Sequence, residues 1–338
     1  MTDAAPIDWS DARVLVTGAS GFLGRHVVRT LLARGVREDR LCAPRSRDYD
    51  LRDPAACARL FGDFPDADAV IHLAGRVGGI QANRAHPAGF LYDNAAMALH
   101  VIEAARRGGL ADRAGAVVMV GSMTSYPEST PVPFREGALF AGPLAEQTRG
   151  YAFGKLVGLE TLIAYGQEFG LASSYLIPVN LYGPGDNFDP ATSHFVGALV
   201  RRCLEAVREG REELVCWGTG EPTRDFLYIE DAAAGVVLAA ERLLAARATG
   251  QPAPCDTRHG AINLSPGNEH SIREAVEIIC RVIGFRGRVV WDTSKPEGQA
   301  RRSLDPSRAR ERLGFEARVS FEEGVRRTAE WIERERPF

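Results

Sequence analysis

A glycine-rich turn near the start of the chain restricts the folds that are open to it. Residues 13–17 form an apolar run typical of a buried strand, and residues 22–33 have the spacing of a helix. Glycines permit a tight turn between the two, and the helix that follows presents free N–H groups to an anion. The segment therefore predicts a strand–turn–helix unit that binds the pyrophosphate of a dinucleotide. The residues expected to line it are Gly18, Ser20, Gly21, Phe22, Leu23 and Gly24.

Strand-like and helix-like segments continue to alternate through the first half of the chain. Strands are predicted at 41–44, 69–74, 116–121 and 173–179, and helices at 54–60, 87–107 and 150–169. This order is typical of a parallel sheet covered by helices. After residue 180 the pattern changes to turn-rich segments and a helix at 195–207. We expect an α/β protein with a Rossmann, doubly wound parallel sheet in residues 1–180. A smaller C-terminal α/β substrate-binding domain is expected in residues 181–338, interleaved with the last strands of the first.

Composition excludes several classes of protein. The 338 residues carry a net charge of −3 and show no basic stretch that would favour a nucleic acid as partner. No apolar run approaches the roughly 18–20 residues that span a bilayer, and the first residues lack the pattern of a signal peptide. The six cysteines are dispersed without metal-ligand spacing. We therefore expect a cytoplasmic protein with reduced thiols, no metal site, and no membrane or nucleic-acid partner.

The type of dinucleotide is indicated by the end of the second predicted strand. An acidic residue there would accept hydrogen bonds from the ribose hydroxyls of NAD, whereas an arginine would pair with the 2′-phosphate of NADP. Arg45 stands at this place, so NADP is favoured over NAD. Asp50 and Leu51 follow and are expected to flank the adenine. The end of the next strand should line the cofactor at the same edge of the sheet, through Leu73, Ala74 and Gly75.

Tyr151 and Lys155 form a candidate proton-transfer pair. Positions four residues apart lie on the same face of a helix, so the ammonium is expected beside the phenol. Lowering the pKa of a tyrosine from about 10 to about 7 takes roughly 4 kcal/mol, much of which a desolvated cation can supply. Ser122 follows an apolar strand, at the edge where open α/β sheets bind ligands. Its hydroxyl can donate to a carbonyl oxygen while Tyr151 exchanges the proton.

With these motifs assembled, the chain resembles the extended short-chain dehydrogenase/reductase family, and within it the GDP-L-fucose synthases. The resemblance covers nearly the whole chain, and its more specific motifs lie at 78–80, 178–184, 186–188, 193–194, 217–226 and 294–298. It implies a GDP-linked sugar as substrate and a homodimer formed through helices of the first domain. It also implies cofactor contacts at Tyr151, Lys155, Pro178, Asn180 and Leu181.

The resemblance assigns further residues to the substrate. His194 matches an acid/base group near the sugar, and Arg202 and Arg224 match positions that engage the nucleotide diphosphate. Planar guanidinium groups suit such an anion because they donate two hydrogen bonds at once. The remaining substrate-side positions that the resemblance implies are Asn94, Asn180, Trp217 and Lys295.

One position departs from the GDP-L-fucose synthase pattern. Those enzymes carry a cysteine two residues after the serine, and this thiol shares the epimerisation at C3 and C5 with the histidine. Here the residue is Thr124. A threonine alkoxide is far too basic to remove a proton next to a ketone at neutral pH, whereas a thiol with a pKa near about 8.5 can be tuned to do so. The Ser-x-Thr arrangement is instead similar to that of UDP-galactose 4-epimerases.

Several functions stay open at this point. Thr124 favours an epimerase that acts at C4 through a transient 4-keto sugar, which is the preferred hypothesis. Arg45 favours an NADPH-dependent reductase of a GDP-4-keto-sugar. The full 3,5-epimerase and 4-reductase reaction, and a dehydratase, are weaker alternatives. A different class of answer is a non-catalytic NAD(P)-sensing protein, which would be expected to lose Tyr151 or Lys155.

Overall fold

A six-stranded parallel sheet forms the centre of the larger part of the molecule. The computed structural model describes residues 7–190, 192–246, 250, 252–295, 298–335 and 338. The strand order is β2 (Leu41–Cys42), β1 (Val14–Thr17), β3 (Ala69–His72), β4 (Ala116–Val120), β5 (Ala172–Pro178) and β9 (Ile262–Leu264). Strands β1, β3 and β4 are buried at every residue. Uninterrupted apolar strands of this kind need helices on both faces of the sheet.

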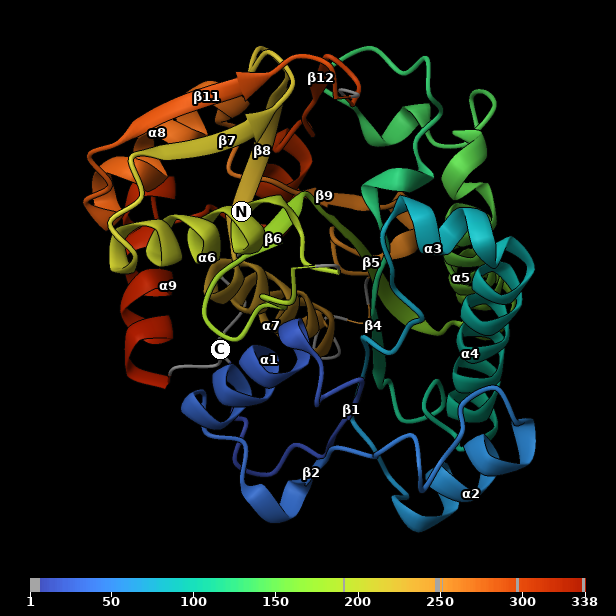
Figure 1. Cartoon of the computed structure of the whole chain (residues 1–338). Coiled ribbons are helices and arrows are strands. Elements are labelled where there is room, and N and C mark those ends of the chain that lie inside the picture. The colour runs from blue at the N-terminus through green and yellow to red at the C-terminus, as the bar shows by residue number, and fades with distance from the viewer. Residues whose placement is uncertain (1–6, 191, 247–249, 251, 296–297, 336–337) are drawn as a thin grey trace.

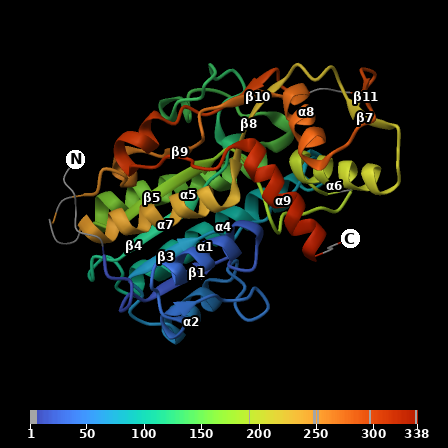
Figure 2. The same cartoon turned by 90° about the vertical axis from the view of Figure 1, so that its left-hand side faces the viewer.

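Helices cover the sheet on both sides, as Figures 1 and 2 show. One face packs against α1 (Phe22–Ala33) and α7 (Ile229–Ala245), which also contact each other. The other face packs against α4 (Pro87–Arg107) and α5 (Arg149–Phe169), with α2 (Pro54–Asp63) beside α4 and the short α3 (Ile80–Ala85) nearby. The arrangement is the doubly wound α/β fold that the sequence predicts.

The second part of the molecule contains two smaller sheets. One joins β10 (Glu269–Ser271), β8 (Thr223–Tyr228) and β12 (Arg301–Arg302), with β6 (Asn180–Tyr182) also paired to β8. The other pairs β7 (Glu213–Trp217) with β11 (Arg288–Asp292). The helices α6 (Phe195–Arg208), α8 (Ile272–Ile283) and α9 (Phe321–Glu335) pack here. Ser271 and Glu274 cap the start of α8 reciprocally, which fixes where that helix begins.

The two parts have separate buried clusters but share the chain. One cluster fills the space around the six-stranded sheet, and the other joins the buried residues of β7, β8, α6, α8 and α9. Both β9 and α7 come from beyond residue 181, yet they belong to the first sheet and its covering layer. Within the described segments, no helix combines the length and the apolar character that crossing a lipid bilayer requires.

The predicted elements of the first half are confirmed with small differences in length. The strand expected at 41–44 contains only Leu41 and Cys42, and the strand expected at 69–74 ends at His72. In the second case the residues after His72 leave the sheet to form the loop beside the glycine turn. The strands β10 and β12 have three and two residues, which is too short to produce a periodic pattern in the sequence.

Candidate active site

Two positions of the glycine turn between β1 and α1 have no room for a side chain. Gly18 has φ +71, and a Cβ there would lie 2.6 Å from the backbone nitrogen of Ala74. A Cβ on Gly24 would lie 2.1 Å from the carbonyl oxygen of Gly18. Gly21 is the N-cap of α1, and the first turn has neither a side-chain cap nor an acidic residue. The turn therefore presents uncapped N–H groups in a backbone cradle, which fits the pyrophosphate of a dinucleotide.

The loop after β3 is held against this turn by a buried polar contact. The Thr17 hydroxyl lies 2.8 Å from Nδ1 of His72, and the backbone nitrogen of Leu73 donates to the carbonyl oxygen of Thr17 at 3.1 Å. Burial, together with the charge of Lys155, lowers the pKa of His72 to about 3, so its imidazole is neutral. The contact places Leu73 and Ala74 beside Gly18. The role of His72 itself was not foreseen, because it depends on a neighbour 55 residues away in the chain.

The residues expected near the adenosine differ in exposure and in whether their charges are paired. Arg45 is exposed, and within the described part of the chain no carboxylate pairs with it. Asp50 is held by Arg52 at 2.7 Å, and this hydrogen-bonded contact lowers the pKa of Asp50 to about 2. Leu51 is buried in the core of the first part. A free arginine beside an aspartate that is already paired favours a 2′-phosphate over unmodified ribose hydroxyls.

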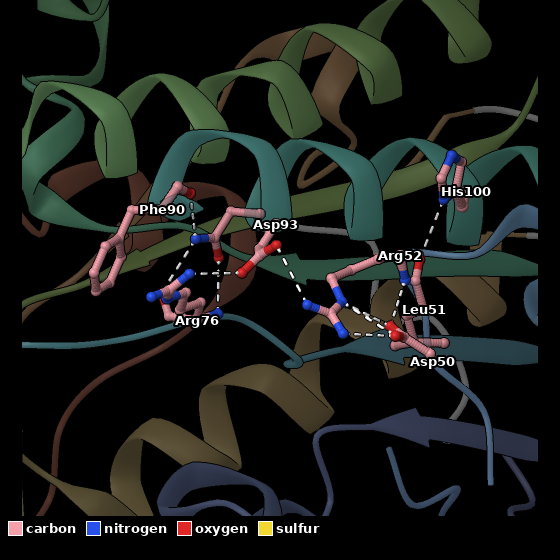
Figure 3. A network of polar contacts seen from close by, with 8 residues as sticks. Asp50, Leu51, Arg52, Arg76, Phe90, Asp93 and His100 are labelled. Carbon is pink, nitrogen blue, oxygen red and sulfur yellow. Dashed lines mark hydrogen bonds and ion pairs between the residues drawn. The ribbon is translucent and has the colours of Figure 1, made fainter. Parts of the chain in front are cut away.

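A chain of ion pairs connects the segment after β2 to α4 (Figure 3). Arg52 also lies 3.6 Å from Asp93 of α4, and Asp93 binds Arg76 at 3.0 Å. The Arg76 guanidinium lies over the ring of Phe90, 4.8 Å from its centroid, and Phe90 meets Tyr151 edge to face. Sequence reasoning missed this network, whose members come from three separate segments. It fixes α4 between the two ends of the cofactor site.

Ser122 is the centre of the polar cluster at the end of β4. Its hydroxyl lies 2.8 Å from the Thr124 hydroxyl and accepts a hydrogen bond from the Thr124 backbone nitrogen at 3.2 Å. It also lies near enough to the phenol of Tyr151 to influence its pKa. The structure thus brings the predicted serine, threonine and tyrosine into one cluster.

Lys155 lies close by but does not contact the phenol as expected. Its ammonium donates to the carbonyl oxygen of Val120 at 3.1 Å, and no hydrogen bond or ion pair joins it to Tyr151. Burial lowers the pKa of Lys155 to about 8. Burial also raises the pKa of Tyr151, and the nearby Ser122 hydroxyl offsets this only in part. The expected lowering of the tyrosine pKa is therefore absent from this geometry, in which the phenol stays protonated at neutral pH.

The side-chain amide of Asn94 uses its hydrogen bonds to hold the backbone next to this site. Its Nδ2 donates to the carbonyl oxygens of Arg76 and Phe90, at 3.1 and 2.8 Å, and its Oδ1 accepts from the Arg76 backbone nitrogen at 3.2 Å. A Cβ on Gly75 would lie 3.0 Å from Asn94 Oδ1 and 3.1 Å from Lys155 Nζ. The amide therefore shapes the loop beside Lys155, and it has no donor left for a substrate.

The remaining predicted cofactor contacts lie where β5 passes into the second part. Pro178 ends β5, and Asn180 and Leu181 begin β6 after a single intervening residue. The amide of Asn180 donates to the carbonyl oxygen of Asp225 at 3.1 Å, and its side chain is exposed. These residues adjoin the carboxyl edge of the six-stranded sheet, where ligands of such folds bind.

The other predicted substrate residues are distributed over the second part. His194 is the exposed N-cap residue of α6, and its ring has no hydrogen-bond partner among the described residues. Arg202 donates to the carbonyl oxygen of Val215 on β7. Trp217 is 64% exposed at the end of the same strand, with the Lys295 ammonium 5.9 Å from its ring centroid. Arg224 lies on β8 and donates to the backbone oxygen of Thr223, at 2.6 Å. Within the described segments, no hydrogen bond, ion pair or ring contact joins these side chains to Tyr151.

The described residues contain no group of three or more histidine, cysteine, aspartate or glutamate side chains placed to hold a metal ion.

Comparisons with known proteins agree with this geometry. Residues 14–250 match the model of the NAD dependent epimerase/dehydratase family. The chain is 35% identical to the GDP-L-fucose synthase of Escherichia coli (strain K12), covering 96% of this chain and 97% of that protein. It is 34% identical to GDP-L-fucose synthase 1 of Arabidopsis thaliana, with 95% and 93% covered. A GDP-L-fucose synthetase structure from Naegleria fowleri bound to NADP is similar at a TM-score of 0.82 and 27% identity, covering 98% of this chain and 96% of that one. The chain belongs to the NAD dependent epimerase/dehydratase family.

Proposed function

We propose that this protein is an NADP(H)-dependent enzyme that acts at C4 of a GDP-linked sugar. The grouping of Ser122 with Thr124 and Tyr151 carries the proposal. The Ser122 hydroxyl contacts the Thr124 hydroxyl and lies near enough to the Tyr151 phenol to influence its pKa, so three hydroxyls gather at the ligand-binding edge of the sheet. The names of the curated relatives support a GDP-sugar as substrate. So does the exposed ring of Trp217, which offers a stacking surface for a base.

Each residue of the cluster has a distinct task in such a reaction. Bound NADP(H) would supply or accept the hydride. Ser122 holds the sugar oxygen by a hydrogen bond, and Thr124 fixes the direction of the Ser122 hydroxyl. Tyr151 gives its phenolic proton to that oxygen when a carbonyl is reduced, or removes the proton when an alcohol is oxidised. The buried charge of Lys155 stabilises the phenolate that results.

The free protein is better prepared for reduction of a 4-keto sugar than for oxidation. The raised pKa of Tyr151 keeps the phenol protonated, as a proton donor must be. The unpaired Arg45 and the paired Asp50 favour NADP(H). We therefore propose reduction at C4 as the net reaction.

Epimerisation at C4 is the second candidate, and Thr124 favours it. Both reactions use the same hydride transfer, and they differ in whether the cofactor leaves before the hydride returns. The full 3,5-epimerisation is disfavoured because it needs a base that removes a proton from carbon, and a threonine alkoxide is too basic for that role.

Product analysis with limiting cofactor separates these candidates. The purified protein would be incubated with GDP-4-keto-hexoses, and separately with GDP-hexoses, at several molar amounts of NADPH. Reduction predicts one product per NADPH consumed, whereas epimerisation predicts many turnovers of a GDP-hexose without added NADPH. Tyr151→Phe should lower either rate by roughly 10²–10⁴-fold and leave NADP affinity unchanged. A sensing protein would turn over neither substrate and would be insensitive to this substitution.

We further propose that the protein works as a cytoplasmic homodimer. Leu91, Tyr92 and Leu99 on α4 and Phe153 and Phe169 on α5 are all exposed apolar residues. Two adjacent helices with this character form a surface suited to a second copy. The six free thiols are typical of a reducing compartment. Light scattering coupled to size-exclusion chromatography would test the dimer, and a mass of one chain at micromolar concentration would contradict it.

A further inference from the structure

The side chain of Arg76 is fixed by residues of the first turns of α4. Asp93 binds Nη1 of Arg76 at 3.0 Å, and the guanidinium lies over the ring of Phe90, 4.8 Å from its centroid (Figure 3). A Cβ on Gly89 would lie only 2.4 Å from the same Nη1. Asn94 holds the backbone of Arg76 through two hydrogen bonds, at 3.1 and 3.2 Å. Both the backbone and the charged end of Arg76 are thus held in one place.

The ring of Phe90 contacts both this guanidinium and Tyr151. Phe90 is 2% exposed, and a Cβ on Gly78 would lie 2.9 Å from its Cζ. The ring of Tyr151 meets it edge to face, with the centroids 6.2 Å apart and the planes at 90°. Within the described segments no other aromatic ring contacts Tyr151. The guanidinium, the ring of Phe90 and the phenol therefore pack in series, so a shift of the first should move the last.

The helix that carries Tyr151 is itself held closely against α4. A Cβ on Gly150 would lie 2.4 Å from the carbonyl oxygen of Pro87, and a Cβ on Gly154 would lie 2.9 Å from a side-chain atom of α4. These two glycines flank Tyr151 on α5, so the two helices approach closely at this point. Because the backbone is fixed, the freedom left to Tyr151 is rotation of its side chain, and the contact with Phe90 restricts that rotation.

We propose that Arg76 is a positioning residue for Tyr151 and acts through the ring of Phe90. The inference rests on the proposed function, in which the phenol must lie within hydrogen-bond reach of the sugar oxygen that it protonates. A cation over one face of a ring and an edge-to-face contact with a second ring both restrain how the rings lie. Since Arg76 acts through another side chain, its loss should lower kcat and leave the affinities for NADP(H) and the sugar nucleotide unchanged.

Two substitutions test this role in different ways. Arg76→Gln removes the charge from the ring of Phe90. Gly89→Ala keeps the charge but places a Cβ where the guanidinium lies, and the guanidinium should move because it is the free end of a flexible side chain. Arg106→Gln is the matched control. Arg106 also binds a carboxylate of α4, that of Glu103, and lies over an aromatic ring, 4.7 Å from its centroid.

Steady-state kinetics of the full chain give the first measurement. We expect Arg76→Gln and Gly89→Ala to lower kcat roughly 3- to 10-fold, the range that corresponds to losing an aromatic contact. The KM values and the melting temperature should stay close to those of the wild type. Arg76→Lys should recover part of the rate, and Arg106→Gln should keep all of it. In a Tyr151→Phe background, Arg76→Gln should cause no further loss, because the phenol through which it acts is gone.

An NMR measurement on Tyr151 needs no substrate and so separates this inference from the proposed function. In protein made with isotope-labelled tyrosine, the signal of Tyr151 is the one that Tyr151→Phe lacks. We expect Arg76→Gln and Gly89→Ala to shift or broaden this signal, since the ring of Phe90 is no longer held from its other side. Arg106→Gln should leave the signal unchanged.

The possible outcomes lead to different conclusions. A Tyr151 signal that is the same in the wild type, Arg76→Gln and Gly89→Ala would overturn the inference, whatever the substrate. A loss of rate that persists in the Tyr151→Phe background, or that comes with weaker NADPH binding and a lower melting temperature, would also overturn it, because Arg76 would then only support the fold. If no GDP-linked sugar is turned over while the signal shifts as expected, the proposed function fails and the control of the Tyr151 ring by Arg76 stands.

Discussion

Lys155→Met should make the free protein more stable at neutral pH while removing its activity. Lys155 is 5% exposed, and burial lowers the pKa of its ammonium from 10.5 to about 8. That difference corresponds to about 3 kcal/mol of free energy spent on keeping the charge inside the folded protein. Methionine has similar length and no charge. Methionine cannot form the hydrogen bond to the carbonyl oxygen of Val120, which contributes roughly 1–2 kcal/mol. The free energy of unfolding should therefore rise by about 1–2 kcal/mol at pH 7.

The difference in stability between the wild type and Lys155→Met should depend on pH. The folded pKa of the amine lies below its unfolded value, so the unfolded chain binds the extra proton between about pH 8 and pH 10.5. The penalty in the wild type is therefore fully present below pH 8 and disappears as the pH rises. Between pH 7 and pH 9.5 the wild type should recover about 2 kcal/mol relative to Lys155→Met.

Urea denaturation of both proteins across this pH range measures the difference directly. Lys295→Met is the matched control, because Lys295 is the other lysine of the chain and is exposed. This control measures the general effect of losing one lysine charge at an exposed position. A Lys155→Met protein that is less stable than the wild type by the same amount at every pH would refute the reasoning. It would show that the buried ammonium is not held at the expense of stability.

Three further substitutions test the site. Thr124→Ala should lower kcat roughly tenfold with little effect on KM, because Ser122 loses its partner hydroxyl. Thr124→Ser should restore the rate, and equal rates in the wild type and both variants would contradict this role. Arg45→Ala should raise the KM for NADPH by roughly 10- to 100-fold and leave the KM for NADH unchanged in steady-state assays, whereas equal effects on both would remove the 2′-phosphate assignment. Gly24→Ala should lower the melting temperature and abolish NADP binding, because its Cβ would lie 2.1 Å from a carbonyl oxygen. Gly62→Ala, whose Cβ would meet nothing within 4 Å, should be neutral, and similar melting temperatures for the two alanine variants would contradict the packing argument.

The first half of the fold could be predicted because its signals are local. Strands buried on both faces have continuous apolar runs, and the glycines at 18, 21 and 24 mark a turn that few other residues could form. The serine, threonine and tyrosine could also be placed, since each lies at a recognisable point of a strand or helix. The short strands of the second part escaped prediction because two or three residues carry no period.

What could not be predicted depends on partners far away in the chain. The spacing of Tyr151 and Lys155 puts both on one face of α5, but burial and the carbonyl oxygen of Val120 decide where the ammonium points. Likewise, no local pattern in the sequence shows what lies next to Arg302. Its position opposite Arg224 follows from the register of β12 with β8, which the sequence alone does not reveal.

Two passages of the chain between the two buried clusters are very short. Val179 alone separates β5 from β6, and α7 begins at Ile229 directly after β8 ends at Tyr228. Each passage joins two regular elements directly, without a flexible hinge. A displacement of one element is therefore transmitted to the other. A sugar nucleotide bound to β8 would therefore affect the elements that also frame the cofactor site. The two parts of the molecule should unfold together in one cooperative transition.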